Sequence, residues 1–357
     1  MKLRVLASLL SVLVCSAQAA APAHYSVSSL GDFYARDMNN LGQVVGGFIS
    51  GQYAGQAGIY SNGVASTLAG LSGVSTLSGI NDSGQIVGNA GTYESEGFIY
   101  SGGTMTMLTP SGNGTFSAVG INNAGQVGGT YYGSGAGGEY TDDAAIYSNG
   151  SISHANFGGL LTRVSGISEN GAVYGSAGTA DGMVAFTYQN GVMTDYSSQL
   201  GNFSVIADVN DKNQLVGTNM EGHTFPSYFI SGGVARYAGD NVGLSSLNNA
   251  GLAVGSRYAF APDGSGGVVG GLLWIDGASY DLNSLIDPAA GWTITSASKI
   301  NERNQILAEG CNASGCGSLL LSPLAAVPEA ETYAMMLLGV GIIGAAARRR
   351  RKQAATV

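Results

Sequence analysis

The sequence is poor in the residues from which most catalytic and metal sites are built. Its 357 residues include only 3 His and 3 Cys. So few histidines leave little room for a Ser-His-Asp triad or a histidine-rich metal site. The chain also contains no Asp-x-Asp-x-Asp-Gly calcium loop. We therefore expect no cofactor and no metal, and we expect His24, His154 and His223 to lie on the surface or in packing contacts.

Positive charge is also scarce, and half of it lies at the two ends of the chain. The terminal segments hold seven of the 14 basic residues, so the part between them has 21 acidic and 7 basic residues, a net charge of about −14. Because phosphate backbones bind to basic surfaces, this balance argues against nucleic acid as a partner. An acidic exterior favours solubility or weak cation binding.

Glycine, by contrast, is abundant, with 58 residues, and many of them belong to a repeated phrase. The phrase reads apolar–Asn–x–x–Gly–Gln–apolar–apolar–Gly, as in INDSGQIVG. Its seven copies are residues 38–46, 80–88, 121–129, 167–175, 209–217, 247–255 and 300–308. Their second positions are 42, 41, 46, 42, 38 and 53 residues apart. A period near 40 residues is typical of propeller blades.

Each phrase is predicted to form a hairpin. The second position is Asn in six copies and Ser168 in the fourth, residues that cap their own turn by bonding the backbone two residues on. The fifth position is Gly except for Asn213 and Asn304, which indicates a backbone with positive φ. A type I turn followed by a left-handed residue is a common hairpin connection.

A second hairpin is predicted after each of the first six copies. Its turns are Asn62-Gly63, Gly102-Gly103, Asn149-Gly150, Asn190-Gly191, Gly232-Gly233 and Asp276-Gly277, all favoured in type I′ turns. The strands before these turns share an aromatic position, expected to pack between blades: Tyr60, Tyr100, Tyr147, Tyr188, Phe229 and Trp274. Four short antiparallel strands per unit make one blade.

The seventh copy has no second hairpin, because Pro323 follows its third strand. Residues 24–30 precede the first phrase as residues 63–68 precede the second, so we expect them to supply the missing outer strand. The predicted fold over residues 24–323 is an all-β, seven-bladed β-propeller of four-stranded antiparallel blades, closed by this N-terminal strand. The alternative is an open β-solenoid, which would need polar capping repeats at both ends.

The N-terminal segment, residues 1–20, is typical of a secretory signal peptide. Lys2 and Arg4 precede an apolar run, and the segment ends in an Ala17-Gln18-Ala19 cleavage site. A lipoprotein anchor at Cys15 is the alternative, although Val14 is large for that kind of site.

The C-terminal segment, residues 327–352, resembles the PEP-CTERM sorting tail of Gram-negative bacteria. The residues that carry the resemblance are Val327, Pro328 and Glu329, an apolar run over 333–347, and Arg348, Arg349, Arg350 and Arg351. Ala330 departs from the family, which most often has a second proline there. The resemblance implies a precursor anchored in the inner membrane by a transmembrane helix and recognised by an exosortase. It also implies a mature form on the cell surface or in the extracellular matrix, often alongside exopolysaccharide.

A plain C-terminal membrane anchor is the alternative interpretation of this tail. Fifteen apolar residues would span roughly 22 Å as a helix, less than the ~30 Å hydrocarbon core of a bilayer. The arginines would stay on the cytoplasmic side. Both interpretations place the repeats outside the inner membrane.

The repeats resemble the extracellular HAF repeat family, whose units carry a G-I-N-x-x-G-Q-V-V-G phrase. Residues 79–88 and 120–129 match it best, whereas the His-Ala-Phe triplet survives only as Ala185-Phe186. The activity of this family is essentially unassigned, so the resemblance implies architecture and compartment only.

A few residues are candidates for chemistry or binding. Cys311 and Cys316 are expected to form a disulfide in the hairpin of the last unit, since a metal site would need more ligands. Two lengthened loops, residues 131–143 and 258–267, carry the ligand-binding candidates, because loops on a rigid scaffold often carry function. These candidates are Tyr131, Tyr132, Glu139, Tyr140, Asp142, Asp143, Tyr258 and Asp263.

Three functions are compatible with the sequence. The first is a non-enzymatic propeller for binding or scaffolding, with an extracellular glycan as its expected partner. The second is a polysaccharide-modifying enzyme that uses paired carboxylates such as Asp142 and Asp143. The third is a purely structural envelope protein. The absence of a convergent catalytic set of residues favours the first, so no residue is assigned a catalytic role.

Overall fold

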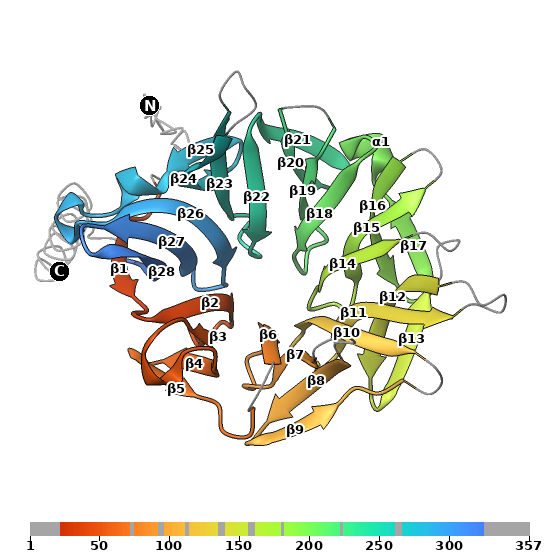
Figure 1. Ribbon diagram of the computed structural model, residues 1–357. Coiled ribbons are helices and arrows are strands. Elements are labelled where there is room, and N and C mark those ends of the chain that lie inside the picture. The colour runs from red at the N-terminus through yellow and green to blue at the C-terminus, as the bar shows by residue number, and fades with distance from the viewer. Residues whose placement is uncertain are drawn as a thin grey trace, which may run out of the picture.

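The computed structural model describes residues 22–71, 75–91, 96–110, 114–134, 140–155, 161–179, 182–221, 224–260 and 266–324. These residues form seven four-stranded antiparallel sheets arranged as blades around a central axis (Figure 1). A channel lined by residues of all seven blades runs along this axis. The predicted seven-bladed propeller is confirmed, and the open solenoid is wrong. We number the blades 1 to 7 along the chain.

The first four blades follow one another from the N-terminal side. Blade 1 is β2 (Phe33–Met38), β3 (Val44–Phe48), β4 (Ala57–Ser61) and β5 (Val64–Thr67). Blade 2 is β6 (Ser75–Ile80), β7 (Ile86–Ala90), β8 (Glu96–Ser101) and β9 (Thr104–Met107). Blade 3 is β10 (Thr115–Ile121), β11 (Val127–Ser134), β12 (Tyr140–Ser148) and β13 (Ser151–Ala155). Blade 4 is β14 (Thr162–Ile167), β15 (Val173–Thr179), β16 (Gly182–Gln189) and β17 (Val192–Asp195).

The remaining three blades complete the ring. Blade 5 is β18 (Ser204–Val209), β19 (Leu215–Asn219), β20 (Ser227–Ser231) and β21 (Val234–Gly239). Blade 6 is β22 (Val242–Leu247), β23 (Ala253–Phe260), β24 (Gly266–Ile275) and β25 (Ala278–Asp281). Blade 7 is β26 (Thr293–Ile300), β27 (Ile306–Asn312), β28 (Gly315–Pro323) and β1 (Tyr25–Ser29). Short helical segments in the described connections are η1 (Gly51–Tyr53), α1 (Ser197–Leu200), η2 (Leu282–Leu285) and η3 (Pro288–Ala290).

The outer strand of blade 7 comes from the other end of the chain. Strand β1 pairs antiparallel with β28, from Tyr25 opposite Pro323 to Ser29 opposite Leu319. Backbone bonds extend the pairing at both ends, with Leu30 N donating to Ser318 O (3.0 Å) and Leu324 N to His24 O (2.7 Å). Residues almost 300 positions apart thus share one sheet.

The strand order gives the ring two faces of different character. The repeated Asn-x-x-Gly turns and the Asn-Gly turns lie on one face, which we call the turn face. The connections between the second and third strands of each blade, and those between blades, lie on the opposite face, which we call the loop face. Strand β28 starts at the loop face and ends at Pro323 on the turn face, so the chain leaves the propeller from the turn face.

Both kinds of predicted turn have the expected backbone. In the first kind the left-handed position is occupied by Gly42 (φ 76°) in blade 1 and by Asn213 (φ 55°) in blade 5. In the second kind both central residues have positive φ, as at Asn62 (51°) and Gly63 (85°). This is the geometry of a type I′ hairpin.

A β-bulge near the end of every inner strand explains the last glycine of the phrase. The register between first and second strands shifts at equivalent places, for example between Ala35 and Asp37 and between Ile206 and Asp208. The bulge brings the inner strand close to the second strand, so a Cβ on Gly46 would lie 1.9 Å from Tyr34 O. At Gly46 only glycine fits this approach without moving the backbone. Blade 7, whose inner strand has a second register shift between Ile294 and Ser296, has Ala308 at the equivalent position.

The core lies between the blades. The aromatic side chains that we predicted to pack there include Phe229 and Trp274, which stack across blades 5 and 6 with ring centroids 4.7 Å apart. Trp274 is 1% exposed and Phe229 is 4% exposed. Interdigitated apolar side chains at each junction hold neighbouring blades together without direct pairing of their sheets.

The membrane-directed segments that we predicted, residues 1–20 and 327–352, lie outside the described residues. Within the part of the chain that the structure describes, no helix has the length and apolarity needed to cross a membrane.

Candidate functional site

A circle of buried asparagines surrounds the channel at the turn face. In six phrases the amide of the second residue donates to the carbonyl of the equivalent residue in the next blade. The donor–acceptor pairs are Asn39–Asn81, Asn81–Asn122, Asn122–Ser168, Asn210–Asn248, Asn248–Asn301 and Asn301–Asn39, with N···O distances of 2.9–3.2 Å. The bond from Asn301 to Asn39 closes the circle.

The same asparagines also cap their own turns, as the sequence predicts. The Oδ1 atom of Asn39 accepts the backbone N–H groups of Leu41 and Gln43, each at 3.0 Å. Its amide also donates to Gln43 Oε1 at 2.8 Å. One buried side chain therefore satisfies its own turn and joins two blades, and the sequence revealed only the first role.

A second circle of bonds runs through the third residue of each phrase. Its backbone N–H donates to the side-chain oxygen of the third residue in the next blade. The pairs are Asn40–Asp82, Asp82–Asn123, Asn123–Glu169, Asp211–Asn249, Asn249–Glu302 and Glu302–Asn40, at 2.7–3.0 Å. The acidic and amide residues at this position are therefore links between blades, which accounts for the carboxylates at the channel mouth.

The junction between blades 4 and 5 has neither link among the described residues. Ser168 has no amide to donate, and no bond joins the N–H of Glu169 to Asp211. Instead, Tyr174 OH donates to Asp208 Oδ1 and Asn170 Nδ2 to Asn213 Oδ1, both at 2.8 Å. A cavity of about 250 Å³ opens at this junction, lined by Ala172, Thr187, Gln189, Val192, Thr194, Tyr196, Val209 and Asn213.

The third-position residues explain why this junction differs. Around the ring they read Asn40, Asp82, Asn123, Glu169, Asp211, Asn249 and Glu302. Acid and amide alternate, but an odd number of blades forces one pair of like residues. That pair is Glu169 and Asp211. Burial raises the pKa of Glu169, and the nearby charges of Asp211, Asp82 and Glu302 raise it further.

Deeper in the channel, the bulges direct a small charged cluster inward. Lys299 Nζ lies 3.7 Å from Asp37 Oδ1, and Asp208 accepts bonds from Tyr174 OH (2.8 Å) and Ser246 Oγ (2.7 Å). Burial raises the pKa of Asp37 despite the nearby ammonium group. Burial opposes the charge on Lys299, but Asp37 and Asp208 outweigh it and raise the pKa of Lys299. Lys299 is therefore protonated at neutral pH.

The channel cavity measures about 230 Å³, and residues from all seven blades line it. Six of these are carboxylates: Asp37, Asp82, Glu169, Asp208, Asp211 and Glu302. Among the described residues, no three His, Cys, Asp or Glu side chains come together in a way that could hold a metal ion. The carboxylates mainly accept hydrogen bonds from neighbouring blades, so they join the blades around the channel.

The carboxylates proposed for hydrolysis, Asp142 and Asp143, are not brought together. They lie in strand β12, not in a loop as the sequence suggested, so they point to opposite sides of the sheet. Asp143 is 3% exposed, and its Oδ2 lies 2.7 Å from His154 Nδ1. The His154 ring stacks on Tyr131, with centroids 4.4 Å apart. The pair is unsuited to act on one glycosidic bond, and Asp143 anchors His154.

The aromatic candidates have separate surroundings. Tyr131 and Tyr132 are also strand residues, in β11, and face opposite sides of the sheet. Tyr131 is engaged with His154, whereas Tyr132 is 43% exposed. Burial and the charge of Asp142 raise the pKa of Tyr132. Tyr258 lies in β23 rather than in the predicted loop and faces a groove on the loop face.

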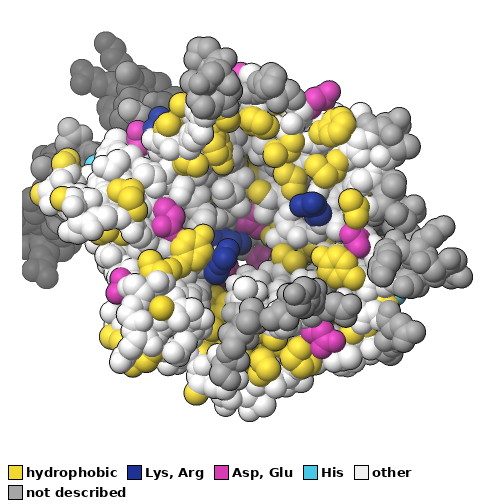
Figure 2. Space-filling view, in the orientation of Figure 1, with side chains coloured by type: hydrophobic (Ala, Val, Ile, Leu, Met, Phe, Trp, Pro, Cys, Tyr) yellow, Lys and Arg dark blue, Asp and Glu magenta, His cyan; other side chains and the backbone are white. Residues whose placement is uncertain are grey.

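This groove, between blades 5 and 6, is an apolar hollow on the loop face. Its volume is about 610 Å³, and its walls include Met220, Phe225, Tyr258, Phe260 and Val268. Figure 2 looks onto the loop face, where hydrophobic side chains gather over these blades beside the central hollow. The sequence revealed Tyr258 but not Phe225 or Phe260, because neither belongs to the repeated phrase.

Phe225 adopts a backbone conformation that is rare for its type. Its φ is +40°, in the left-handed region that bulky residues avoid. Such strain costs about 1–3 kcal/mol and persists where surrounding contacts enforce it. Here Asn219 N donates to Pro226 O (3.0 Å) and Asn241 N to Thr224 O (2.5 Å), bonds that fix the backbone on both sides of Phe225.

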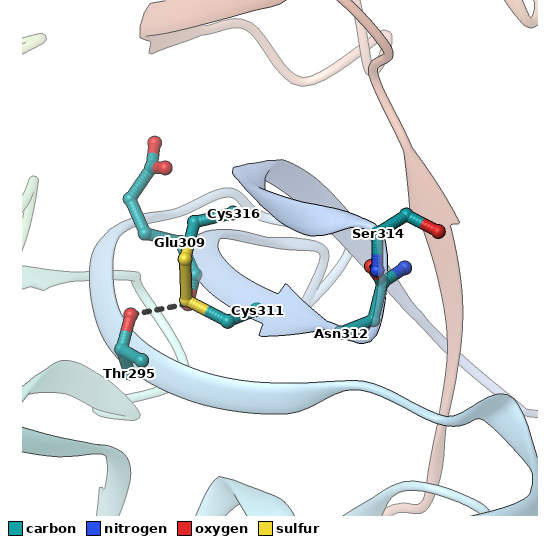
Figure 3. Close-up of a disulfide and its surroundings, with 6 residues drawn as sticks. All are labelled: Thr295, Glu309, Cys311, Asn312, Ser314 and Cys316. Atoms are coloured by element: carbon teal, nitrogen blue, oxygen red, sulfur yellow. Dashed lines mark hydrogen bonds between the residues drawn. A yellow bond between two sulfur atoms is a disulfide. The ribbon is translucent and has the colours of Figure 1, made fainter.

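The two cysteines of blade 7 are joined, as Figure 3 shows. Cys311 and Cys316 are opposite each other in the β27–β28 hairpin and form a disulfide. Ser314 N donates to Asn312 Oδ1 at 2.8 Å within the turn that they close. The disulfide fixes one hairpin tip on the loop face and leaves no thiol there for chemistry.

Several predicted residues lie outside the described residues. They are Glu139, Asp263, His223, the side chain of Tyr140, and the sorting residues Val327, Pro328, Glu329 and Arg348, Arg349, Arg350 and Arg351.

Comparison with known proteins identifies the tail and supports the fold. A model of the PEP-CTERM protein-sorting motif matches residues 326–351. Such a motif implies recognition by an exosortase and export to the cell surface. No curated protein matches the chain closely enough to count as a relative. The HAF-type character of the repeats stays a prediction.

Two solved structures share the architecture. The β-propeller domain of the Trilobed protease from Pyrococcus furiosus aligns with a TM-score of 0.52 and 10% identity, covering 85% of this chain and 98% of that one. A puromycin-hydrolyzing peptidase from Mycobacterium tuberculosis aligns with a TM-score of 0.51 and 11% identity, covering 87% of this chain and 57% of that one. This chain therefore spans just over half of the peptidase. At such identities the likeness shows the fold alone.

Proposed function

We propose that this protein is an exported, surface-associated β-propeller that binds extracellular glycan through its loop face and does not act as an enzyme. The sorting motif supports export to the surface. The observation that carries the binding role is the apolar groove between blades 5 and 6, because exposed apolar hollows of this size usually mark interaction sites.

The direction in which the chain leaves the ring supports the same proposal. The last described strand ends at Pro323 on the turn face, ahead of the sorting motif at residues 326–351. A tail held by the membrane or by an exosortase therefore lies on the turn-face side, and the loop face points away from it. The groove is then directed toward the extracellular matrix.

An enzymatic role has less support from the described residues. The carboxylate pair that motivated it is divided between the two sides of a sheet, and Asp143 is engaged with His154. Changing Asp142→Asn should therefore leave any turnover of extracellular polysaccharide unchanged. Loss of such turnover in this variant would favour the enzyme.

The test of the proposed function compares the full chain with a chain lacking residues 326–351 in the producing bacterium. We expect the full chain at the surface or in the matrix, and the shortened chain to be lost from that fraction. The purified mature protein should also be retained on the extracellular polysaccharide fraction of the same cells. A surface location without retention on any polysaccharide would instead indicate a purely structural envelope protein.

A further inference from the structure

The groove between blades 5 and 6 has the construction of a recognition site. We call it the aromatic groove and define it by Val205, Met220, Phe225, Tyr258, Phe260 and Val268. Its volume of about 610 Å³ lies within the range of small-ligand sites, about 300–1,000 Å³. Phe260 is 42% exposed, Val268 44% and Met220 48%, so the apolar walls are open to solvent.

The side chains of Phe225, Tyr258 and Phe260 together form an aromatic cluster in the wall of the groove. The Phe225 and Phe260 centroids lie 5.6 Å apart, and those of Tyr258 and Phe260 lie 6.4 Å apart with ring planes only 18° from parallel. Tyr258 and Phe260 are two residues apart in β23 and therefore project from the same side of the strand. Tyr258 and Phe260 thus present nearly parallel apolar faces, and the Phe225 ring is tilted by 42° against that of Phe260.

The frame around these rings is fixed before any ligand binds. Tyr258 N donates to Asn241 O at 2.8 Å, and Met220 N donates to Phe203 O at 2.8 Å. The strained backbone of Phe225 is held between bonded neighbours, and strain of this kind is concentrated at ligand clamps. A preorganised site loses less conformational entropy when its ligand arrives.

The lining also defines the charge of the ligand. The described residues of the groove include no Asp, Glu, Lys or Arg, although the exported chain is strongly acidic. Its side-chain polar groups are the hydroxyls of Ser245 and Tyr258 and that of Thr218, which is buried and bonded to Ser227 Oγ at 2.6 Å. A charged polymer would lose its hydration here without an ion pair in return, which is unfavourable. An uncharged ligand with flat apolar faces and hydrogen-bonding edges fits this lining.

The position of the groove argues against a lipid surface as its occupant. The chain leaves the propeller from the turn face, and the groove is on the loop face. A membrane that held the tail would therefore be on the opposite side of the ring.

We propose that the aromatic groove is the binding site for an uncharged glycan, with pyranose rings stacked on Tyr258, Phe260 and Phe225. The inference rests on the proposed function and adds the location of the site and the charge of its ligand. Pyranose rings present flat C–H faces to the aromatic rings, while their equatorial hydroxyls remain free to bond with Ser245 and solvent.

The test is titration calorimetry of the mature protein, purified from its producing cells, with four probes. Three are neutral, namely cellopentaose, xylopentaose and mannopentaose, and one is charged, a pentamer of galacturonate. We expect at least one neutral probe to bind and the charged probe to bind at least tenfold more weakly. The variant Phe260→Ala should lose at least tenfold in affinity, Tyr258→Ala should also lose affinity, and Phe260→Trp should keep most of it.

The matched control is Tyr237→Ala. Tyr237 is an aromatic residue of similar exposure (52%) on the outer strand of blade 5, away from the groove. The Tyr237→Ala variant should bind the neutral probe with wild-type affinity. Thermal unfolding should show that all variants are folded. If the wild type binds a neutral probe and Phe260→Ala binds it equally well, the groove is not the site, although the proposed function stands.

Two further outcomes would contradict the inference in different ways. If the wild type binds no neutral probe but is retained on extracellular polysaccharide, the assignment of an uncharged glycan is wrong. If the wild type binds no neutral probe and is not retained on extracellular polysaccharide, the proposed function itself fails. A change from dimer to monomer in Phe260→Ala would show that the groove is occupied by a second copy of the chain, which also overturns the glycan site.

Discussion

Six junctions of this ring are built alike, and the junction between blades 4 and 5 is built differently. At each of the six, an asparagine amide reaches the next blade's carbonyl, and a backbone N–H reaches the next blade's side-chain oxygen. At the seventh, Ser168 replaces asparagine, Glu169 faces Asp211, and a cavity is present. The repeated phrase is therefore more than a turn, because its side chains hold the blades together.

The comparison also shows how the irregular junction is stabilised. Tyr174 and Asp208 supply a bond deeper in the channel, and Asn170 and Asn213 supply one at the surface. Of these four residues, Tyr174 and Asn170 have no counterpart of the same type in the other blades, whereas Asp37 and Asn304 are the equivalents of Asp208 and Asn213. A change in the phrase should therefore have different consequences at different junctions.

The largest effect is expected from removing the strand that completes the ring. A chain without residues 22–30 would leave the edge of β28 unpaired beside a buried apolar surface. Exposed strand edges promote aggregation. We expect this variant to be insoluble or to lack a cooperative thermal transition, whereas a soluble variant with wild-type melting would show that closure by β1 is dispensable.

The next largest effect is expected at a regular junction, and it is measured against the same kind of change at the irregular junction between blades 4 and 5. Asn39→Ala removes two donated and two accepted bonds, leaving the carbonyl of Asn81 with only the N–H of Gly84 from its own turn. We expect a loss of about 2–4 kcal/mol in the free energy of unfolding, measured with guanidinium. Ser168→Ala, the matched change at the irregular junction, should cost only about 1 kcal/mol. Equal losses would show that the link between blades contributes nothing.

The converse change should make the irregular junction regular. Ser168→Asn supplies the missing amide, which can donate to the carbonyl of Asn210 as its equivalents do in other blades. Because one buried hydrogen bond contributes about 0.5–1.5 kcal/mol, we expect a rise in stability of that size. Thermal unfolding would measure it, and a lowered melting temperature would mean that the junction does not accommodate the larger side chain.

The smallest effect is expected from neutralising one of the like charges of Glu169 and Asp211, which are neighbours across the irregular junction. Glu169→Gln removes the repulsion with Asp211 and keeps an oxygen for the N–H of Asn123, so it should stabilise by roughly 0.2–1 kcal/mol at pH 7 and low salt. The folded-state pKa of Glu169 is raised, so the wild-type residue becomes neutral as the pH falls through that value. The advantage of the variant should therefore be present at pH 7 and shrink toward pH 4. An advantage independent of pH would show that charge is not its cause.

The sequence predicted the parts of the fold that repeat. Seven phrases gave the number of blades, and the left-handed position gave the turn geometry, because only Gly and Asn adopt it readily. The bulges were not predicted, since they arise from the pairing of two strands rather than from either strand alone. They direct Asp37, Asp208 and Lys299 into the channel.

The candidate site was predicted less well, because its residues lie outside the repeated phrase and the phrase therefore does not predict their positions. Asp142 and Asp143 were assigned to a loop, but β12 begins at Tyr140, and strand alternation separates their side chains. Phe225 and Phe260 lie at the ends of connections that differ in length from blade to blade. Among the candidates that the structure describes, Tyr258 alone lies in the groove.

Hydrogen exchange of the third-position backbone amides tests the central claim most directly, since each amide reports on one junction. The amides of Asn40, Asp82, Asn123, Asp211, Asn249 and Glu302 donate to the next blade, and that of Glu169 does not. We predict slow exchange at the first six and markedly faster exchange at Glu169. Equal protection at all seven, or fast exchange at all seven, would contradict a ring joined by the repeated phrase at every junction but one.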